Sequence, residues 1–132
     1  MMYKRKIPIE LNCGLDLVRE VLYGKWKTHL IYFISQGIKR PGDLERKIPG
    51  VTRRVLHVQL NQLEGHGLIS KKIYAELPPK VEYTLTEFGE TLLPVIEALG
   101  KWGDDHQEHL RRVIAQSQAN SGMFSNREKN NV

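Results

Sequence analysis

The sequence predicts one mainly α-helical domain with a small β-hairpin, an α+β fold. Leu56, Leu60 and Leu63 recur at helical spacing, and so do the apolar residues of segment 92–113. Between these segments, two short runs rich in β-branched and aromatic residues flank the turn Leu77-Pro78-Pro79. A chain of 132 residues is long enough for one hydrophobic core and too short for two ordinary domains.

Two scaffold helices are predicted in the first 37 residues. Leu15, Val18 and Leu22 repeat at helical spacing, which indicates a helix that begins at Cys13 and ends near residue 24. A second helix is expected from residue 25 to Gly37, where the glycine stops it. We expect its Trp26 to lie in the core, because a large aromatic ring there fixes the packing of the other helices.

A pair of helices joined by a tight turn is predicted next, at residues 42–48 and 52–66. Thr52 stands where an N-cap hydroxyl accepts a backbone N–H, and Gly67 suits the left-handed residue that ends a helix. The leucine stripe of the second helix must be buried. Its opposite face carries Arg54, Val58 and Asn61, with His57 at the flank and Arg53 near the start.

This exposed face has two cations and several hydrogen-bond donors, and no carboxylate before Glu64. An amphipathic helix of this kind, held by a preceding helix and a short turn, can lie in a DNA major groove. A solvated surface helix that happens to lack acids is the alternative.

A hairpin of two strands, residues 68–76 and 80–85, is predicted directly after the helix pair and would form a wing. We expect Lys80, beside the turn, to contact phosphate. For Lys71 and Lys72, contact with DNA and simple protection of a sheet edge are both plausible, since adjacent strand residues point to opposite faces.

A long helix is predicted from Thr86 to about residue 116, with a kink or break near Leu93 because Pro94 lies inside it. Its apolar stripe exceeds what a core of this size can cover. We interpret the surplus as a homodimer interface shared with the first helix; packing back onto the first two helices is the alternative. Residues 115–132 are polar and aperiodic, and we expect them to be disordered.

The charge is unevenly distributed. Residues 1–85 contain 15 Lys and Arg against 8 Asp and Glu, whereas residues 86–116 contain 3 against 6. The basic part coincides with the helix pair and the hairpin, and such a field attracts polyanions.

Several classes of protein are disfavoured by what the sequence lacks. It has no apolar run of membrane-spanning length and no secretory signal, which predicts a cytoplasmic protein without membrane contact. It has no phosphate loop, HExxH, CxxC or GxSxG motif, so we expect neither an enzyme nor a cofactor. His106 and His109 have a spacing that can hold a metal ion, but a charged helix end explains them better.

The order of these elements and their particular residues resemble the HxlR family of winged helix-turn-helix transcriptional regulators. The matching residues cover about residues 13–110 and are Cys13, Gly24-Lys25-Trp26, Asp43-Leu44, Ile48-Pro49-Gly50-Val51, Leu56, Leu60, Leu63-Glu64, Gly67-Leu68-Ile69, Pro78-Pro79, Val81-Glu82-Tyr83, Leu85-Thr86, Gly89, Leu92-Leu93-Pro94 and Trp102-Gly103.

The resemblance implies a homodimer in which the first and last helices pair and two recognition helices enter successive major grooves of double-stranded DNA. On that basis the DNA-binding candidates are Thr52, Arg53, Arg54, His57, Val58, Asn61 and Lys80. Arginine can fork onto guanine and asparagine onto adenine, and valine can meet a thymine methyl group.

The resemblance also implies that Cys13 is a candidate redox sensor. A helix N-terminus favours a thiolate, which is the reactive form of cysteine. This chain differs from the family in having Gly14 where proline is common, and it has no second cysteine. A bridge between two Cys13 residues, alkylation or a mixed disulfide remain open, as does a purely structural role at a dimer interface.

We therefore expect an N-terminal arm at residues 1–12, a DNA-binding and dimerising domain at residues 13–114, and a tail at residues 115–132. One alternative is a winged-helix module for protein contacts, which would favour an acidic or apolar face at residues 52–62. Another is a small cysteine-dependent enzyme, which would need a histidine partner for Cys13.

Overall fold

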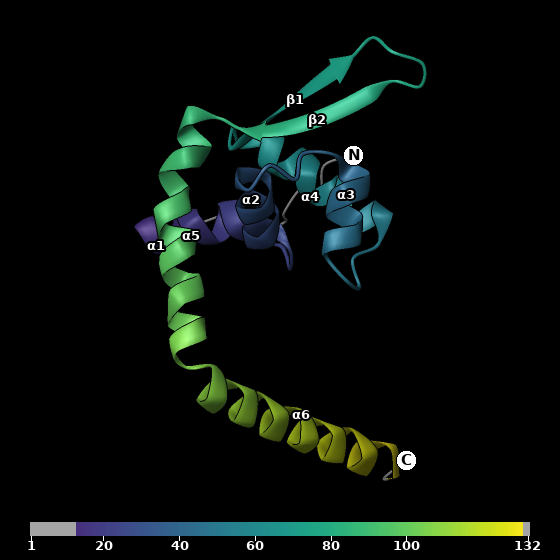
Figure 1. Cartoon of the computed structure of the whole chain (residues 1–132). Coiled ribbons are helices and arrows are strands. Elements are labelled where there is room, and N and C mark those ends of the chain that lie inside the picture. The colour runs from purple at the N-terminus through teal and green to yellow at the C-terminus, as the bar shows by residue number, and fades with distance from the viewer. Residues whose placement is uncertain (1–12, 131–132) are drawn as a thin grey trace. The chain divides into compact units, whose positions relative to one another are not determined.

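The computed structural model describes residues 13–130, and their side chains as far as residue 121. It contains helices and strands in the order α1 (Gly14–Leu22), α2 (Lys27–Ser35), α3 (Pro41–Lys47), α4 (Arg53–Gly65), β1 (Ile69–Tyr74), β2 (Lys80–Leu85), α5 (Glu87–Asp105) and α6 (Gln107–Asn130) (Figure 1). The predicted α+β class is confirmed. The expected arm at residues 1–12 lies outside the described residues.

The chain divides into two compact units, Met1–Pro94 and Val95–Val132. In the first unit, α2 packs against α4 and β2, and α4 also contacts α3 and β1. The core between them consists of Leu30, Ile31, Ile34, Leu44, Ile48, Leu56, Leu60, Leu63, Leu68, Ile69 and Tyr83. Trp26, which we expected in this core, is only half-buried.

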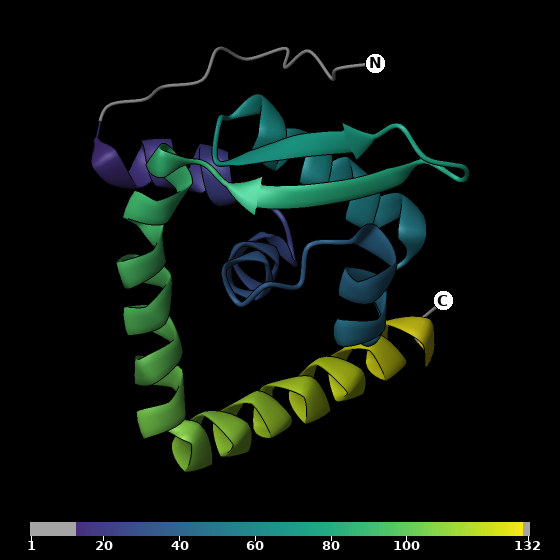
Figure 2. The same cartoon turned by 45° about the horizontal axis from the view of Figure 1, so that its top comes forward.

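The hairpin β1–β2 is antiparallel, with Ile69 opposite Leu85 at one end and Tyr74 opposite Lys80 at the other. Figures 1 and 2 both show its connecting turn projecting beyond the helices. Tyr83 is buried beneath the hairpin, and its backbone N–H donates to the carbonyl of Lys39 over 2.9 Å. Burial raises the pKa of Tyr83, and the charge of Glu64 acts in the same direction. The base of the wing is therefore attached to the segment that leads into α3.

The start of α5 is fixed against the end of α4. Thr86 Oγ1 donates to the carbonyl of Gly67 over 2.6 Å and accepts the backbone N–H of Gly89 over 2.9 Å. A Cβ atom at Gly89 would lie 2.0 Å from the carbonyl oxygen of Leu68, so only glycine fits there. Thr86 starts the helix as its hydroxyl predicts, whereas the need for glycine depends on the backbone of Leu68, the residue before β1.

The C-terminal part of the chain differs from the predicted single helix. The helix continues through Pro94 without a break and is interrupted instead at His106, between α5 and α6. The carbonyl of Trp102 accepts the His106 backbone N–H over 3.2 Å and also lies 2.8 Å from His106 Nδ1. A side chain that competes for a helical carbonyl in this way disturbs the regular pattern of helix hydrogen bonds.

Helix α6 continues to Asn130, where disorder was predicted from residue 115. No proline follows Pro94, and this segment contains Gln, Ala, Arg, Glu and Lys, which favour helix. The side chains of residues 115–121 are all exposed. Over residues 115–121 the helix therefore reflects local preference rather than packing, and the domain boundary at residue 114 stays a prediction. Among the described residues, no helix has the length and apolarity needed to cross a membrane.

Candidate nucleic-acid interface

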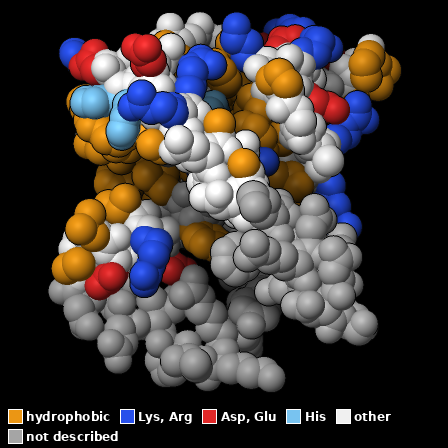
Figure 3. Space-filling model, turned by 90° about the horizontal axis from the view of Figure 1, so that it is seen from below, with side chains coloured by type: hydrophobic (Ala, Val, Ile, Leu, Met, Phe, Trp, Pro, Cys, Tyr) orange, Lys and Arg blue, Asp and Glu red, His pale blue; other side chains and the backbone are white. Residues whose placement is uncertain are grey.

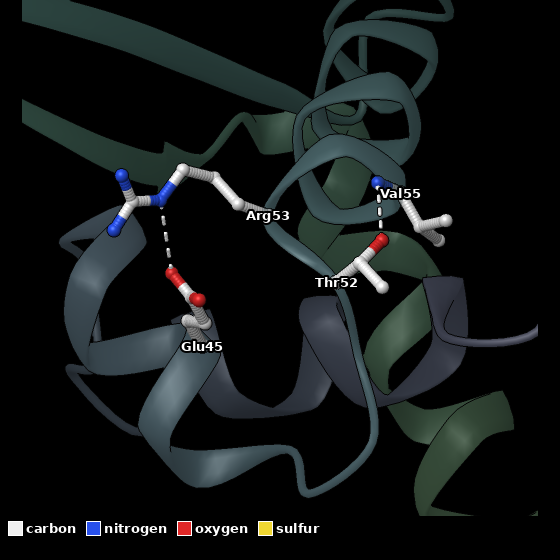
Figure 4. A network of polar contacts seen from close by, with 4 residues as sticks. All are labelled: Glu45, Thr52, Arg53 and Val55. Carbon is white, nitrogen blue, oxygen red and sulfur yellow. Dashed lines mark hydrogen bonds and ion pairs between the residues drawn. The ribbon is translucent and has the colours of Figure 1, made fainter.

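The N-terminus of α4 is capped by Thr52, as predicted. Thr52 has an extended backbone, and its Oγ1 accepts the N–H of Val55 over 3.1 Å (Figure 4). At the other end, Gly67 has φ +75°, and the N–H of Leu68 donates to the carbonyl of Leu63 over 3.0 Å. This left-handed residue ends the helix in the expected way. Both ends of α4 are thus defined by residues that the sequence already indicates.

The inner face of α4 is firmly held. Leu56, Leu60 and Leu63 are at most 1% exposed, which confirms the predicted stripe. Gln59 is buried on the same face, and its Oε1 accepts the backbone N–H of Trp26 over 3.0 Å. Gln59 was not among the predicted residues, although its place one turn from Leu56 and from Leu63 indicates the buried face. This long-range hydrogen bond fixes α4 against the N-terminus of α2.

The outer face of α4 brings most of the candidate residues together. Its exposed side chains are those of Arg53, Arg54, His57, Val58 and Asn61. Among the described residues, Arg54 has no ion-pair partner, so its guanidinium is open to solvent. This face is polar, cationic and attached to a rigid inner face.

Arg53 has a carboxylate partner that the sequence did not reveal. Its Nε lies 3.4 Å from Oε2 of Glu45, a residue of α3 (Figure 4). A hollow of about 400 Å³ lies beside this ion pair, between α3, the turn and the start of α4. It is lined by Gly42, Glu45, Arg46, Ile48, Pro49, Gly50, Val51 and Arg53.

The candidate cation of the wing, Lys80, is also paired. Its Nζ lies 2.9 Å from Oε1 of Glu82 and 4.8 Å from the centre of the Tyr74 ring. Lys72 Nζ lies 4.8 Å from the same ring. Because residues two apart on a strand share a face, these four side chains form one cluster, which we call the wing cluster.

The pKa of Glu82 is lowered, chiefly by the hydrogen bond from Lys80 and further by the charges of Lys80, Arg40 and Lys39. The Lys80 side chain is only 29% exposed. Its charge is thus partly neutralised within the hairpin. Lys71 lies outside this cluster and is exposed.

Acidic and basic side chains lie next to one another at several places on the face drawn in Figure 3. Arg46 pairs with Asp43 on α3 in the same way. The basic balance of residues 1–85 therefore overstates the number of cations that are free to meet a phosphate.

The helix α1 begins at Cys13, which is its exposed N-cap residue and donates its backbone N–H to Asp16 Oδ2 over 3.2 Å. No residue of α1 is buried. Leu15, Leu17 and Val18 are 79%, 50% and 45% exposed. A shallow apolar hollow of about 220 Å³ separates α1 from the first turns of α5. Much of the apolar surface of α1 is therefore uncovered in one copy of the chain.

The second unit also has exposed apolar side chains. Those of Val95, Leu99, Trp102 and Ile114 are each more than half exposed. His109 Nδ1 lies 3.1 Å from Arg112 Nη2, and among the described residues no three potential ligands approach one another as a metal site requires.

Comparisons with known proteins agree on one class. The family model for HxlR-like helix-turn-helix proteins matches residues 21–111. The uncharacterized HTH-type transcriptional regulator YkvN of Bacillus subtilis is 43% identical over 75% of this chain and 84% of its own length. A second B. subtilis regulator of the same description, YybR, is 35% identical over 98% of this chain and all of its own.

Solved structures give the same result. The redox regulator HypR in its reduced form superposes with a TM-score of 0.71 and 38% identity, over 75% of this chain and 98% of that one. Its oxidised form superposes with a TM-score of 0.67 and 41% identity, over 70% of this chain and 96% of that one.

Proposed function

The chain belongs to the family of HxlR-like helix-turn-helix proteins, whose relatives are transcriptional regulators, and we propose that it binds specific sites on double-stranded DNA as a homodimer. The observation that carries this proposal is the outer face of α4. It is exposed, cationic and free of carboxylates over residues 53–61, on a helix whose opposite face is buried.

We assign base reading to the outer face of α4. Arg54 and Asn61 supply the donors that pair with guanine and adenine, and Val58 is an apolar contact for a thymine methyl group. Arg53 and His57 lie on the same face, and Thr52 fixes the start of the helix close to the DNA backbone. The wing contributes mainly to phosphate contact through exposed lysines, with Lys80 the weaker contributor because Glu82 neutralises it.

Dimer formation rests on the uncovered apolar surfaces. Exposed leucine and valine side chains gather on α1, and a second exposed apolar set lies on residues 95–114. Burying such surface between two copies is favourable in proportion to its area, at roughly 25 cal/mol per Å². A two-fold dimer would also present two copies of α4 to successive half-sites.

We further propose that oxidants or electrophiles regulate DNA binding through Cys13. The thiol belongs to an exposed residue at the end of α1, beside the apolar surface assigned to the dimer. HypR, which is similar to this chain, is described as a redox regulator in reduced and oxidised forms. Because the chain has one cysteine, a disulfide can form only between copies or with another thiol.

The test of the proposal is titration of the purified chain with the DNA upstream of its own gene and with a scrambled duplex, at several salt concentrations. We expect saturable binding by one dimer, tighter than to the scrambled duplex, with an affinity that falls steeply as salt rises. Equal weak binding to both duplexes would instead favour a module for protein contacts.

The same titration after treatment with a quinone or peroxide tests the cysteine. We expect oxidation to change the affinity of the wild type and to leave Cys13→Ser unaffected. A variant that is inhibited as strongly as the wild type would exclude Cys13 as the sensor.

A further inference from the structure

The ion pair between Glu45 and Arg53 joins the two helices of the helix-turn-helix. Glu45 lies on α3 and its side chain is 33% exposed, whereas Arg53 is the first residue of α4 and its side chain is 78% exposed. Glu45 is thus the partly buried partner of the pair, and Arg53 is the exposed one. It connects the supporting helix to the helix that, in the function proposed above, reads bases.

The geometry of the pair leaves the reading end of Arg53 free. A guanidinium has five N–H donors, and Glu45 accepts from Nε alone. Figure 4 shows the Arg53 side chain reaching from the start of α4 toward α3, with its two terminal nitrogen atoms pointing away from the carboxylate. Those terminal nitrogens form the fork that can bind O6 and N7 of guanine.

Glu45 stands on a rigid support. Its neighbour Leu44 is fully buried, and Ile48, one turn later, is 2% exposed. The backbone that carries Glu45 is therefore held by the core, while the Arg53 side chain by itself would sample many rotamers. Asp43 offers a contrast on the same helix, because its partner Arg46 also belongs to α3 and the pair orients nothing on α4.

We propose that Glu45 is a positioning residue that orients the guanidinium of Arg53 for a guanine and thereby sets the specificity of DNA binding. This inference rests on the proposed function. The negative charge of Glu45 also repels phosphate, so the residue lowers affinity for arbitrary DNA while it raises discrimination between sequences.

The experiment selects binding sites from a library of random-sequence duplexes with five forms of the full chain: wild type, Glu45→Gln, Asp43→Asn, Arg53→Ala, and the double variant that combines Glu45→Gln with Arg53→Ala. Glu45→Gln and Asp43→Asn each remove one negative charge from α3, and Asp43→Asn leaves the contact to Arg53 intact. Affinities for the wild-type site, for single-base variants of it and for a scrambled duplex are then measured, and thermal melting establishes that each variant is folded.

We expect Arg53→Ala to lose the preference for guanine at one position of each half-site. Glu45→Gln should lower the preference at that same position about fivefold, a part of the discrimination that a bidentate contact supplies, while binding the scrambled duplex at least as tightly as the wild type. Asp43→Asn should leave every base preference unchanged. With Ala at position 53, adding Glu45→Gln should change no base preference.

Three results would overturn the inference. If the wild type selects a site and the Glu45→Gln variant shows the same base preferences at every position of that site, Glu45 does not position Arg53. The proposed function would then stand without this inference. If Glu45→Gln weakens binding to all duplexes equally, its role is structural. A wild type that selects no common site contradicts the proposed function itself, and the inference falls with it.

Discussion

The outer face of α4 and the wing cluster are both basic, yet they hold their cations differently. On α4, Arg53 pairs with Glu45 through Nε, whereas the exposed Arg54 has no ion-pair partner among the described residues. In the hairpin, Lys80 is bound to Glu82 and lies over Tyr74, which also holds Lys72. A cation that must first leave a carboxylate gains less from meeting a phosphate. We therefore expect the two regions to contribute unequally to DNA binding in spite of similar composition.

The difference also shows why net charge is a poor guide to a binding surface. A count of Lys and Arg treats Arg54 and Lys80 alike. Their surroundings separate them: one projects from a helix whose polar face lacks acids, and the other is part of a cluster that stabilises a small hairpin. The following predictions test this contrast, from the largest expected effect to the smallest.

The outer face of α4 depends on the buried face beneath it. Leu60→Ala removes a fully buried side chain from that face, and we expect the free energy of unfolding to fall by about 2–5 kcal/mol, measured by urea denaturation. Val58→Ala, on the exposed face of the same helix, is the matched control and should change stability by less than about 0.5 kcal/mol. Equal losses in the two variants would mean that α4 is not anchored as described.

Arg54→Ala should weaken binding to the specific site by about 1–3 kcal/mol and leave the dimer intact, because a free, exposed guanidinium is lost from the reading face. Fluorescence anisotropy gives the affinity and analytical ultracentrifugation the oligomeric state. Lys80→Ala is the comparison, and its effect should be smaller. If Lys80→Ala weakens binding more than Arg54→Ala does, the contrast between the two regions is wrong.

Thr52→Ala removes the oxygen that accepts the Val55 N–H and should lower the free energy of unfolding by about 1 kcal/mol. The hydroxyl of Thr91 donates to the carbonyl of Phe88 within α5 and caps no free backbone N–H, so Thr91→Ala should have a smaller effect. Thermal melting of the two variants compares them directly. A Thr52→Ala variant as stable as the wild type would argue against the cap.

The smallest effect concerns pH and the wing cluster. The pKa of Glu82 is lowered in the folded chain, chiefly by the hydrogen bond from Lys80. The pairing therefore stabilises the fold fully at pH values above the ordinary carboxyl pKa of 4.5. This contribution is lost progressively as the pH falls from there through the lowered pKa of the folded chain. The difference in melting temperature between wild type and Glu82→Gln should therefore shrink in acid. At neutral pH, Glu82→Gln should also bind DNA slightly more tightly, because Lys80 is released. A difference that stays constant with pH would contradict the assignment.

Most of the helix pair could be predicted because its signals are local. The hydroxyl of Thr52, the three leucines of α4 and Gly67 each act within a few residues, and α4 was expected at residues 52–66 and is observed at Arg53–Gly65. The hairpin was predicted equally well, because its signals are also local. They are the two short runs rich in β-branched and aromatic residues, which replace the helical spacing of apolar residues, and the Pro-Pro turn between them. Its observed strands begin and end within two residues of the predicted positions.

What the sequence did not predict depends on contacts between distant segments. Lys27 is 2% exposed, its Nζ lies 3.4 Å from the carbonyl of Val21, and burial lowers its pKa against the opposing charge of Glu20. The bond from Trp26 to Gln59 spans 33 positions. The ion pair between Glu45 and Arg53 depends on the angle between α3 and α4, and the spacing of residues in the sequence does not specify that angle. The pairing of Lys80 with Glu82 was also not predicted, although its signal is local: residues two apart on a strand share a face.

The measurement that tests the central claim most directly is a titration of the isotopically labelled full chain with the duplex from upstream of its own gene, followed by amide chemical shifts. We expect the largest changes at residues 53–61 and smaller ones in the hairpin. Changes concentrated on α1 or α6, with residues 53–61 unaffected, would contradict the assignment of α4 as the helix that reads DNA.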